Sequence, residues 1–239
     1  MKKLLAVGDV HGTSYWKQIV KNAKKDTIIV FIGDYFDSFD IGGDEQIANF
    51  KEILAFKKKN PERVILLIGN HEVHYISSLN QRYSGYQLGK AREIGQLLAP
   101  LIRRGTLVAC YQNNRFLFTH AGVSKTWFKT VGIDENDKRP LSSIINDLFH
   151  ENTEAFGFNS IDRTGYGDSV YQGPLWIRPE PLLSDAIKGY VQVVGHTHVD
   201  KINCEKDVIF IDTMGRSREY LEITTSGNPV IKTYENICR

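Results

Sequence analysis

Three short apolar runs, at 4–7, 27–32 and 64–68, mark the first third of the chain, and a glycine follows each of them. Their length of four to six residues and their aliphatic, partly β-branched content favour buried strands. Amphipathic patterns between them predict a helix over 15–25 and a second helix that begins at Asp44. Because strand and helix alternate, we expect right-handed crossovers and a parallel sheet.

The second half of the chain has a pattern more typical of antiparallel strands. Runs at 106–112 and 115–119 flank Asn113 and Asn114, a pair that favours a tight hairpin turn. Further short strands are predicted at 190–194, 208–212, 220–225 and 230–234.

The stretch 124–189 combines scattered aromatic residues with glycine and proline, and only one helix is predicted in it, near 141–150. Long insertions inside a compact domain are often functional. We therefore expect one α/β domain over 1–239, with an insertion around 124–189 that faces the substrate.

The composition excludes several classes of protein. With 41% hydrophobic and 24% charged residues in 239, the chain is neither disordered nor fibrous. A net charge of +2 does not indicate a nucleic-acid partner. Cys110, Cys204 and Cys238 lie far apart without metal-binding spacing, and the apolar run at 4–7 is too short for a signal peptide or membrane span. We expect a cytoplasmic protein without a membrane partner.

Polar residues follow the first three predicted strands at the point where each strand ends. Asp9, Asp34 and Asn70 are separated by 25 and 36 positions, yet each lies within two residues of a strand end. In an open α/β sheet, ligands bind beyond the carboxyl ends of the strands. These three side chains are therefore expected to meet at one edge.

Histidines complete a donor set that suits divalent metals. Asp9 and His11 are two residues apart, so an extended backbone would direct both to one side. Imidazole nitrogens are also available from His120, His196 and His198. Oxygen and nitrogen donors without thiolate favour manganese, with iron or zinc as alternatives. Two such ions contribute about four positive charges against two from the aspartates, a balance that suits a phosphate substrate.

Five segments in this order resemble the calcineurin-like metallophosphoesterase superfamily, and within it the phosphoprotein serine/threonine phosphatases and their bacterial and phage relatives. These segments are Gly8-Asp9-Val10-His11-Gly12, Gly33-Asp34-Tyr35-Phe36-Asp37, Gly69-Asn70-His71-Glu72, Thr119-His120-Ala121-Gly122-Val123-Ser124 and Gly195-His196-Thr197-His198. The resemblance implies a β-sandwich flanked by helices, a four-layer α/β/β/α fold. It also implies hydrolysis of a phosphorylated substrate by in-line attack of a hydroxide that bridges two metals.

The resemblance further implies how the ligands divide between two metal ions that share Asp34. One ion would be held by Asp9, His11 and Asp34. His198 matches the last histidine of the wider superfamily and would be a further ligand of this ion. The other ion is held by Asp34, Asn70, His120 and His196.

A general acid is also implied by the resemblance. His71 would protonate the leaving alkoxide, and Asp37 would orient and charge the imidazole ring. By contrast, His74 and Tyr75 are expected only to pack beneath the loop. For Tyr83 and Tyr86, a position in the wall of the substrate site and a packing role are both open.

The chain departs from the phosphoprotein phosphatases at Ser38, where that family has an arginine that clamps phosphate oxygens. A hydroxyl does not replace a bidentate guanidinium. Arg178 resembles the family's second phosphate-binding arginine and is the first candidate, with Arg82 and Arg92 as weaker ones.

Three functions remain open at this level. The leading hypothesis is a two-metal phosphomonoesterase, with phosphoserine or phosphothreonine in proteins among its candidate substrates. A nucleotide or dinucleoside-polyphosphate hydrolase would use the same core. A non-catalytic scaffold of this fold would be expected to have lost ligands or the acid, and the presence of His71 and Asp37 argues against it. Taken singly, each of these polar residues could instead cap a helix or satisfy buried backbone.

Overall fold

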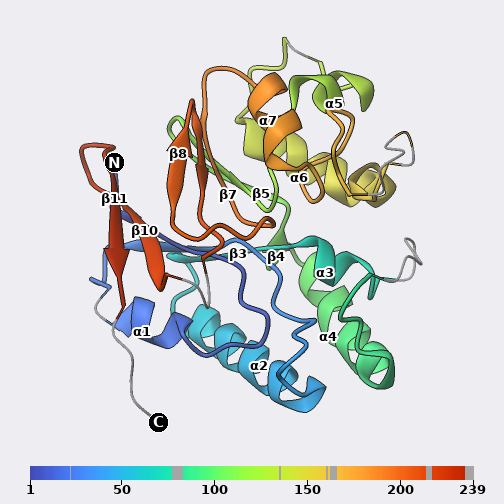
Figure 1. Cartoon of the computed structure of the whole chain (residues 1–239), viewed down its shortest axis with the longest axis vertical. Coiled ribbons are helices and arrows are strands. Elements are labelled where there is room, and N and C mark those ends of the chain that lie inside the picture. The colour runs from blue at the N-terminus through green and yellow to red at the C-terminus, as the bar shows by residue number, and fades with distance from the viewer. Residues whose placement is uncertain are drawn as a thin grey trace.

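Two β-sheets stack face to face, and helices cover both outer faces (Figure 1). The computed structural model describes residues 1–21, 23–76, 83–134, 136–159, 161, 166–213 and 217–234. Within them the first sheet has the order β11 (Pro229–Thr233), β10 (Glu219–Ile223), β1 (Leu4–Val7), β2 (Ile28–Phe31), β3 (Val64–Leu67) and β4 (Leu107–Val108). The second has the order β5 (Cys110–Asn113), β6 (Phe116–Thr119), β7 (Val191–Val194), β9 (Val208–Phe210) and β8 (Asn203–Glu205).

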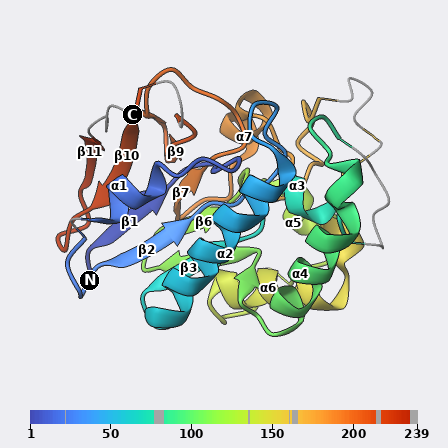
Figure 2. The same ribbon diagram turned by 90° about the horizontal axis from the view of Figure 1, so that it is seen from below.

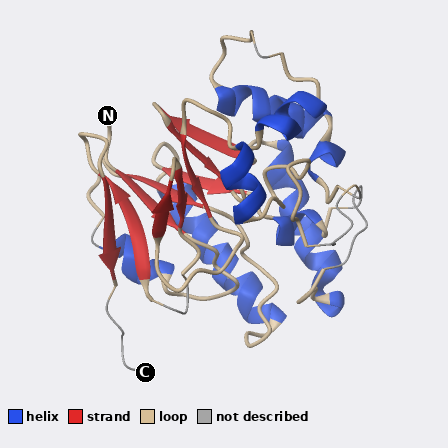
Figure 3. Ribbon diagram, turned by 45° about the horizontal axis from the view of Figure 1, so that its top comes forward, coloured by secondary structure: helices blue, strands red, loops and turns tan. Residues whose placement is uncertain are grey.

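The helices form the two outer layers, as Figures 1 and 3 show. The first sheet is covered by α1 (Trp16–Lys21), α2 (Gly43–Lys59) and α4 (Ala91–Arg103). The second is covered by α5 (Lys125–Thr130), α6 (Leu141–Glu151), the 3₁₀ turn η2 (Thr153–Phe156) and α7 (Pro179–Asp185). The short helix α3 (Asn70–Val73) and the 3₁₀ turn η1 (Leu88–Lys90) lie between β3 and α4. The predicted four-layer α/β/β/α architecture is confirmed.

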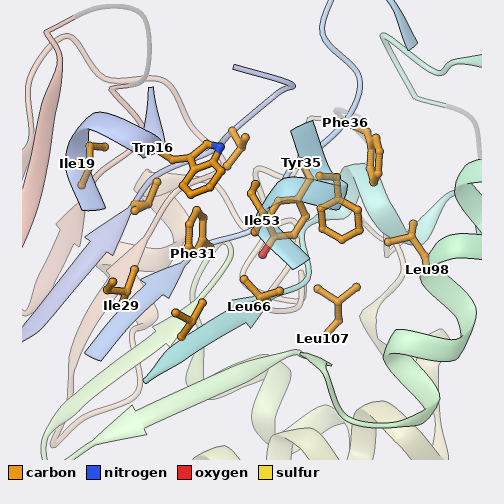
Figure 4. Packing of buried hydrophobic residues seen from close by; sticks show 14 of the residues in the cluster. Trp16, Ile19, Ile29, Phe31, Tyr35, Phe36, Ile53, Leu66, Leu98 and Leu107 are labelled. Atoms are coloured by element: carbon orange, nitrogen blue, oxygen red, sulfur yellow. The ribbon is translucent and has the colours of Figure 1, made fainter. Parts of the chain in front are cut away.

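The strands of the first sheet are buried on both faces, which explains their continuous apolar sequence. In β1, Leu5 and Val7 belong to the core beneath the helices, and Leu4 and Ala6 to the core between the sheets. Figure 4 shows the first of these cores, where the α1 residue Trp16 packs against the strands.

The predicted parallel arrangement of the first three strands is correct. β1 pairs with β2, and β2 with β3, both in parallel (Figure 2). β1 has the predicted bounds, β2 and β3 are two residues and one residue shorter than predicted, and the first two helices occupy 16–21 and 43–59.

The antiparallel reading of the second half is only partly correct. The central pairs β6–β7 and β7–β9 are parallel, and the antiparallel pairs lie toward the edges, at β5–β6, β8–β9 and β10–β11. Hydrophobic pattern reports which residues are buried and not which strand lies beside them, so direction is not encoded in it. Strand β8 was not predicted because its three residues are exposed.

The run at 106–112 is divided between the two sheets. β4 joins the first sheet and β5 the second, with the buried Ala109 between them. The hairpin turn is also shifted by one residue: Asn113 pairs with Phe116, so that Asn114 and Arg115 form the turn. Asn114 has a φ of 53°, a left-handed conformation that asparagine tolerates.

The segment 124–189 packs against the body of the protein. Helix α6 matches the predicted helix at 141–150, whereas α4, α5 and α7 were not predicted. Buried side chains of the segment 124–189 share one core with Ile68, Ala109 and Leu117. Among the described residues, no helix combines the length and apolar character needed to cross a bilayer. Cys110 and Cys204 are free thiols, and Cys238 lies outside the described residues.

Candidate metal centre

Six parallel strands, three from each sheet, lead within one to three residues into a polar side chain. In chain order these side chains are Asp9 after β1, Asp34 after β2, Asn70 after β3, His120 after β6, His196 after β7 and Asp212 after β9. Backbone bonds join neighbouring loops within each sheet: His11 N–H donates to Asp34 O (2.7 Å) in the first, and Gly195 N–H donates to His120 O (2.8 Å) in the second. Across the two sheets, the N–H of His196 donates to the carboxylate of Asp9. The carboxyl ends of these six strands thus lie at the same edge of the two stacked sheets.

Five of the predicted metal-binding residues meet there, and we call them the candidate centre: Asp9, Asp34, Asn70, His120 and His196. Oδ1 of Asn70 lies 2.8 Å from Nε2 of His120 and 3.0 Å from Nδ1 of His196. Nε2 of His120 is 3.4 Å from Oδ2 of Asp34. One ligand atom each from Asp9, Asp34 and His120 lie within 4.8 Å of one another.

His11 lies beside the centre, and His198 lies at its rim. Nδ1 of His11 donates to the carbonyl of Phe36 (2.6 Å), which leaves Nε2 facing Oδ2 of Asp34 at 3.7 Å. His11 has a φ of 41°, so the extended geometry expected from the Asp9–His11 spacing is wrong. The ring of His198 lies 6.4 Å from that of His11 and its side chain is 53% exposed.

Strained backbone is concentrated at the site. Among the described residues, seven non-glycine residues have positive φ, and four of them are His11, Asp34, Asp37 and His196. Such conformations persist only where surrounding structure enforces them. The buried strands on both sides of these loops supply that enforcement.

Two motif glycines make room for the aspartates. A Cβ at Gly69 would overlap Oδ1 of Asp34, and a Cβ at Gly195 would overlap Oδ1 of Asp9. The N–H of His196, the next residue, donates to Oδ2 of Asp9 at 3.0 Å. The glycine at each strand end is therefore required by the close approach of a carboxylate.

Glu72 joins two of the motif loops. Its buried carboxylate accepts hydrogen bonds from the backbone N–H groups of Gly69 (2.8 Å), Asp34 (2.9 Å) and Tyr35 (2.7 Å). Burial and the charge of Asp34 raise the pKa of Glu72 to about 8, although the backbone donors act against this rise. Glu72 holds the Asp34 loop at the start of α3.

The electrostatics of the centre fit divalent cations. Burial raises the pKa of Asp9 well above its usual range, and the neighbouring carboxylates of Asp212 and Asp34 add to the effect. Burial lowers the pKa values of His11 and His196, which favours neutral imidazoles with lone pairs, the form that binds metals. Buried Nε2 of His196 has no hydrogen-bond partner among the described residues. A cation would satisfy these groups together.

A second cluster surrounds Asp37. Its Oδ2 lies 2.8 Å from Nδ1 of His71 and 2.6 Å from Nε2 of His74, and Tyr75 donates its hydroxyl to Oδ1. The N–H of His71 also donates to Oδ1 of Asp34 at 3.1 Å. Burial opposes protonation of His71, but the carboxylates of Asp34 and Asp37 outweigh it and raise the pKa to about 9. His71 is therefore held as an imidazolium next to the centre.

Arg178 reaches the same edge from the start of α7. Its NH1 donates to Thr197 Oγ1 (3.1 Å) and to the carbonyl of His196 (3.4 Å). Burial lowers the pKa of the guanidinium, and the charges of Asp168, Asp34 and Asp9 counteract this. Among the other candidates, Arg92 is exposed on α4 and Arg82 lies outside the described residues. The Ser38 hydroxyl accepts from the N–H groups of residues 40 and 41.

Several site residues were missed or misjudged from sequence. His74 and Tyr75 contact Asp37 directly, and Tyr83 and Tyr86 stack on their rings. The spacing of His71 and His74 is that of neighbours on one helical turn, which was an available signal. Asp212 directly follows the buried run that ends at Ile211, the same signal that identified Asp9.

The chain belongs to the calcineurin-like phosphoesterase family, whose pattern matches residues 2–200. It is 28% identical over 188 residues to a probable serine/threonine-protein phosphatase of Encephalitozoon cuniculi (strain GB-M1). That match covers 76% of this chain and 35% of the relative, so the chain spans about a third of the relative's length.

Solved structures share the fold at low identity. A serine/threonine phosphatase from Saccharomyces cerevisiae with similarity to human phosphatase PP5 has a TM-score of 0.57 and 14% identity, covering 100% of this chain and 81% of that one. A protein proposed to be a diadenosine tetraphosphatase has a TM-score of 0.51 and 14% identity, covering 98% and 95%.

Gly195→Ala should disrupt the centre without unfolding the chain. The added methyl group displaces the carboxylate of Asp9, so we expect Mn²⁺ binding to weaken by at least about tenfold. Isothermal titration calorimetry measures this, with circular dichroism to check the fold. Gly89→Ala is the matched control, because a Cβ there meets nothing within 4 Å. Equal Mn²⁺ affinity in the two variants would contradict a role of Asp9 in metal binding.

Proposed function

We propose that this chain is a two-metal phosphoesterase that hydrolyses phosphomonoesters. The observation that carries the proposal is the convergence of Asp9, Asp34, Asn70, His120 and His196 at one buried edge, within hydrogen-bonding or metal-bridging range. Membership of the calcineurin-like phosphoesterase family supports it.

We assign the ligands to two cations that share the carboxylate of Asp34. Asp9, His11 and Asp34 would hold one, with His198 as a further ligand, and Asp34, Asn70, His120 and His196 would hold the other. Nδ1 of His11 and Nδ1 of His120 both face backbone carbonyls, at Phe36 and Ile32, which supports Nε2 as the ligand atom of each. Manganese is the expected ion. When bound, such a pair of ions lowers the pKa of water and neutralises developing negative charge on phosphate.

The residues of the chain then control the proton and the phosphate. As an oxygen from water forms its bond to phosphorus, the bond from phosphorus to the alkoxide oxygen breaks. Nε2 of His71 gives its proton to that oxygen, because Nδ1 is held by Asp37. The products are the free alcohol and inorganic phosphate. A pKa of about 9 for His71 keeps the acid protonated near neutral pH.

Arg178 is the proposed phosphate clamp in place of the arginine that is absent at Ser38. Its hydrogen bonds to the His196–Thr197 loop support this assignment. Since Arg178 belongs to the stretch 124–189, the same contacts support a substrate-facing role for that insertion.

Two substrate classes are favoured by different observations. The relative from Encephalitozoon cuniculi supports phosphoserine or phosphothreonine in proteins as the substrate. The absence of an arginine at Ser38, followed by Phe39 with 82% of its surface exposed, favours a nucleotide or dinucleoside polyphosphate, whose base would stack on the ring.

His71→Asn should lose activity and keep metal. Removing the acid costs about 10²- to 10⁴-fold in kcat, because the leaving alkoxide must then depart without a proton. Steady-state kinetics on an aryl phosphate and metal analysis of the same sample measure the two effects. His150→Asn, an exposed histidine on α6, serves as the control. Loss of metal in His71→Asn would show that His71 is a ligand.

Chelation should abolish activity and lower the melting temperature. A cation present at 100 times its Kd stabilises the native state by about 2.7 kcal/mol per site, and excess chelator removes that contribution. Differential scanning calorimetry with and without chelator, followed by Mn²⁺ replacement, measures it. An unchanged melting temperature would contradict tight metal binding.

A substrate panel tests the proposed reaction directly. The Mn²⁺-loaded chain should release inorganic phosphate from an aryl phosphate, and kcat/KM for a phosphothreonine peptide and a dinucleoside tetraphosphate should separate the two classes. If no phosphoester in the panel is hydrolysed, the proposed function is wrong and a scaffold role is supported instead.

A further inference from the structure

Asp212 is a buried carboxylate at the candidate centre for which the proposed reaction has no role so far. It follows β9 and is 1% exposed. The backbone of Ile211 and Asp212 runs directly against the end of β1: a Cβ at Gly8 would lie 2.7 Å from the carbonyl oxygen of Ile211 and 3.3 Å from Cα of Asp212. The residue after Gly8 is Asp9, so Asp212 stands behind the first ligand of the centre.

Asp212 holds the loop that carries His198 at two points. Nδ1 of His198 lies 2.5 Å from Oδ2 of Asp212. The backbone carbonyl of Asp212 accepts a hydrogen bond from the N–H of Val199 at 3.0 Å. Side chain and backbone of one buried residue therefore fix His198 and its neighbour.

The environment of Asp212 differs from that of a carboxylate with a purely structural role. Glu72, equally buried, accepts three hydrogen bonds from backbone N–H groups. Neither oxygen of Asp212 has a hydrogen-bond donor among the described residues apart from the contact with His198. A buried charge that the backbone does not compensate needs a cationic partner. Asp9, whose pKa the charge of Asp212 raises, and His198, which contacts Asp212, are groups that could bind such a cation.

Two of the other proposed ligand histidines, His11 and His120, have an outer partner for Nδ1. Nδ1 of His11 is held by the carbonyl of Phe36, and Nδ1 of His120 by the carbonyl of Ile32. In each case the remaining nitrogen is Nε2. Outer partners of this kind fix the tautomer and the direction of a metal-binding imidazole. His198 lies on a half-exposed loop, and for it the partner is the Asp212 carboxylate.

We propose that Asp212 is a positioning residue of the metal centre, which holds Nδ1 of His198 so that this histidine offers Nε2 to the cation bound by Asp9 and His11. The inference rests on the proposed two-metal function, and it assigns a role in metal binding to a residue outside the five motifs.

The test is Mn²⁺ titration of the full chain by calorimetry, with Asp212→Asn, His198→Ala and the double variant. We expect each single substitution to weaken binding at the Asp9 side by about 10- to 100-fold. If Asp212 acts through His198, the double variant binds no more weakly than His198→Ala. Asp207→Asn, an exposed aspartate in the β8–β9 turn, is the matched control and should bind as the wild type.

Two results would overturn the proposal. Unchanged Mn²⁺ affinity in Asp212→Asn, or a further loss when Asp212→Asn is added to His198→Ala, shows that Asp212 does not act through His198. His198 is 53% exposed, so His198→Ala is expected to fold even if Asp212→Asn does not, and unchanged affinity in His198→Ala alone also overturns it. Because Mn²⁺ binding needs no substrate, wild-type binding without phosphoester turnover would refute the proposed function and leave this inference standing.

Discussion

The rest of the site depends on the burial of several carboxylates at the edge where the two sheets meet. Asp9, Asp34 and Asp212 are at most 2% exposed, and burial together with its carboxylate neighbours raises the pKa of Asp9 well above its usual range. Taking such charges out of water costs several kcal/mol each unless they are compensated. The chain places the imidazoles of His11 and His196, whose pKa values burial lowers, and the amide oxygen of Asn70 around them, which are groups that can bind a cation. A bound cation would therefore compensate the buried charge of Asp9 and Asp212.

Rigid strands make this arrangement possible. Left-handed backbone at His11, Asp34, Asp37 and His196 would relax in a flexible loop, but each follows a strand that is packed on both faces. Glu72 joins two of the loops, and Gly69 and Gly195 let backbone approach a carboxylate where any Cβ would collide. The hydrophobic cores thus supply the energy that holds the ligand atoms in place.

Sequence reasoning found the residues that follow buried strands and missed those defined by contacts between loops. Asp9, Asp34 and Asn70 were predictable because parallel strands share an edge, and His120 and His196 because their motifs resemble a known family. The spacing of His71 and His74 indicates neighbours on one helical turn, but it does not show that His74 and Tyr75 both contact Asp37. The predicted antiparallel direction of the central strands in the second sheet is wrong for the same reason: a buried apolar run does not indicate which strand pairs with it or in which direction. Asp212 carried a readable signal, a buried run followed by a carboxylate.

The most direct test of a shared carboxylate is anomalous diffraction from crystals grown with Mn²⁺. We expect two anomalous peaks, both in contact with the carboxylate of Asp34, one toward Asp9 and His11 and the other toward Asn70, His120 and His196. A single peak, or two peaks that Asp34 does not join, would contradict it.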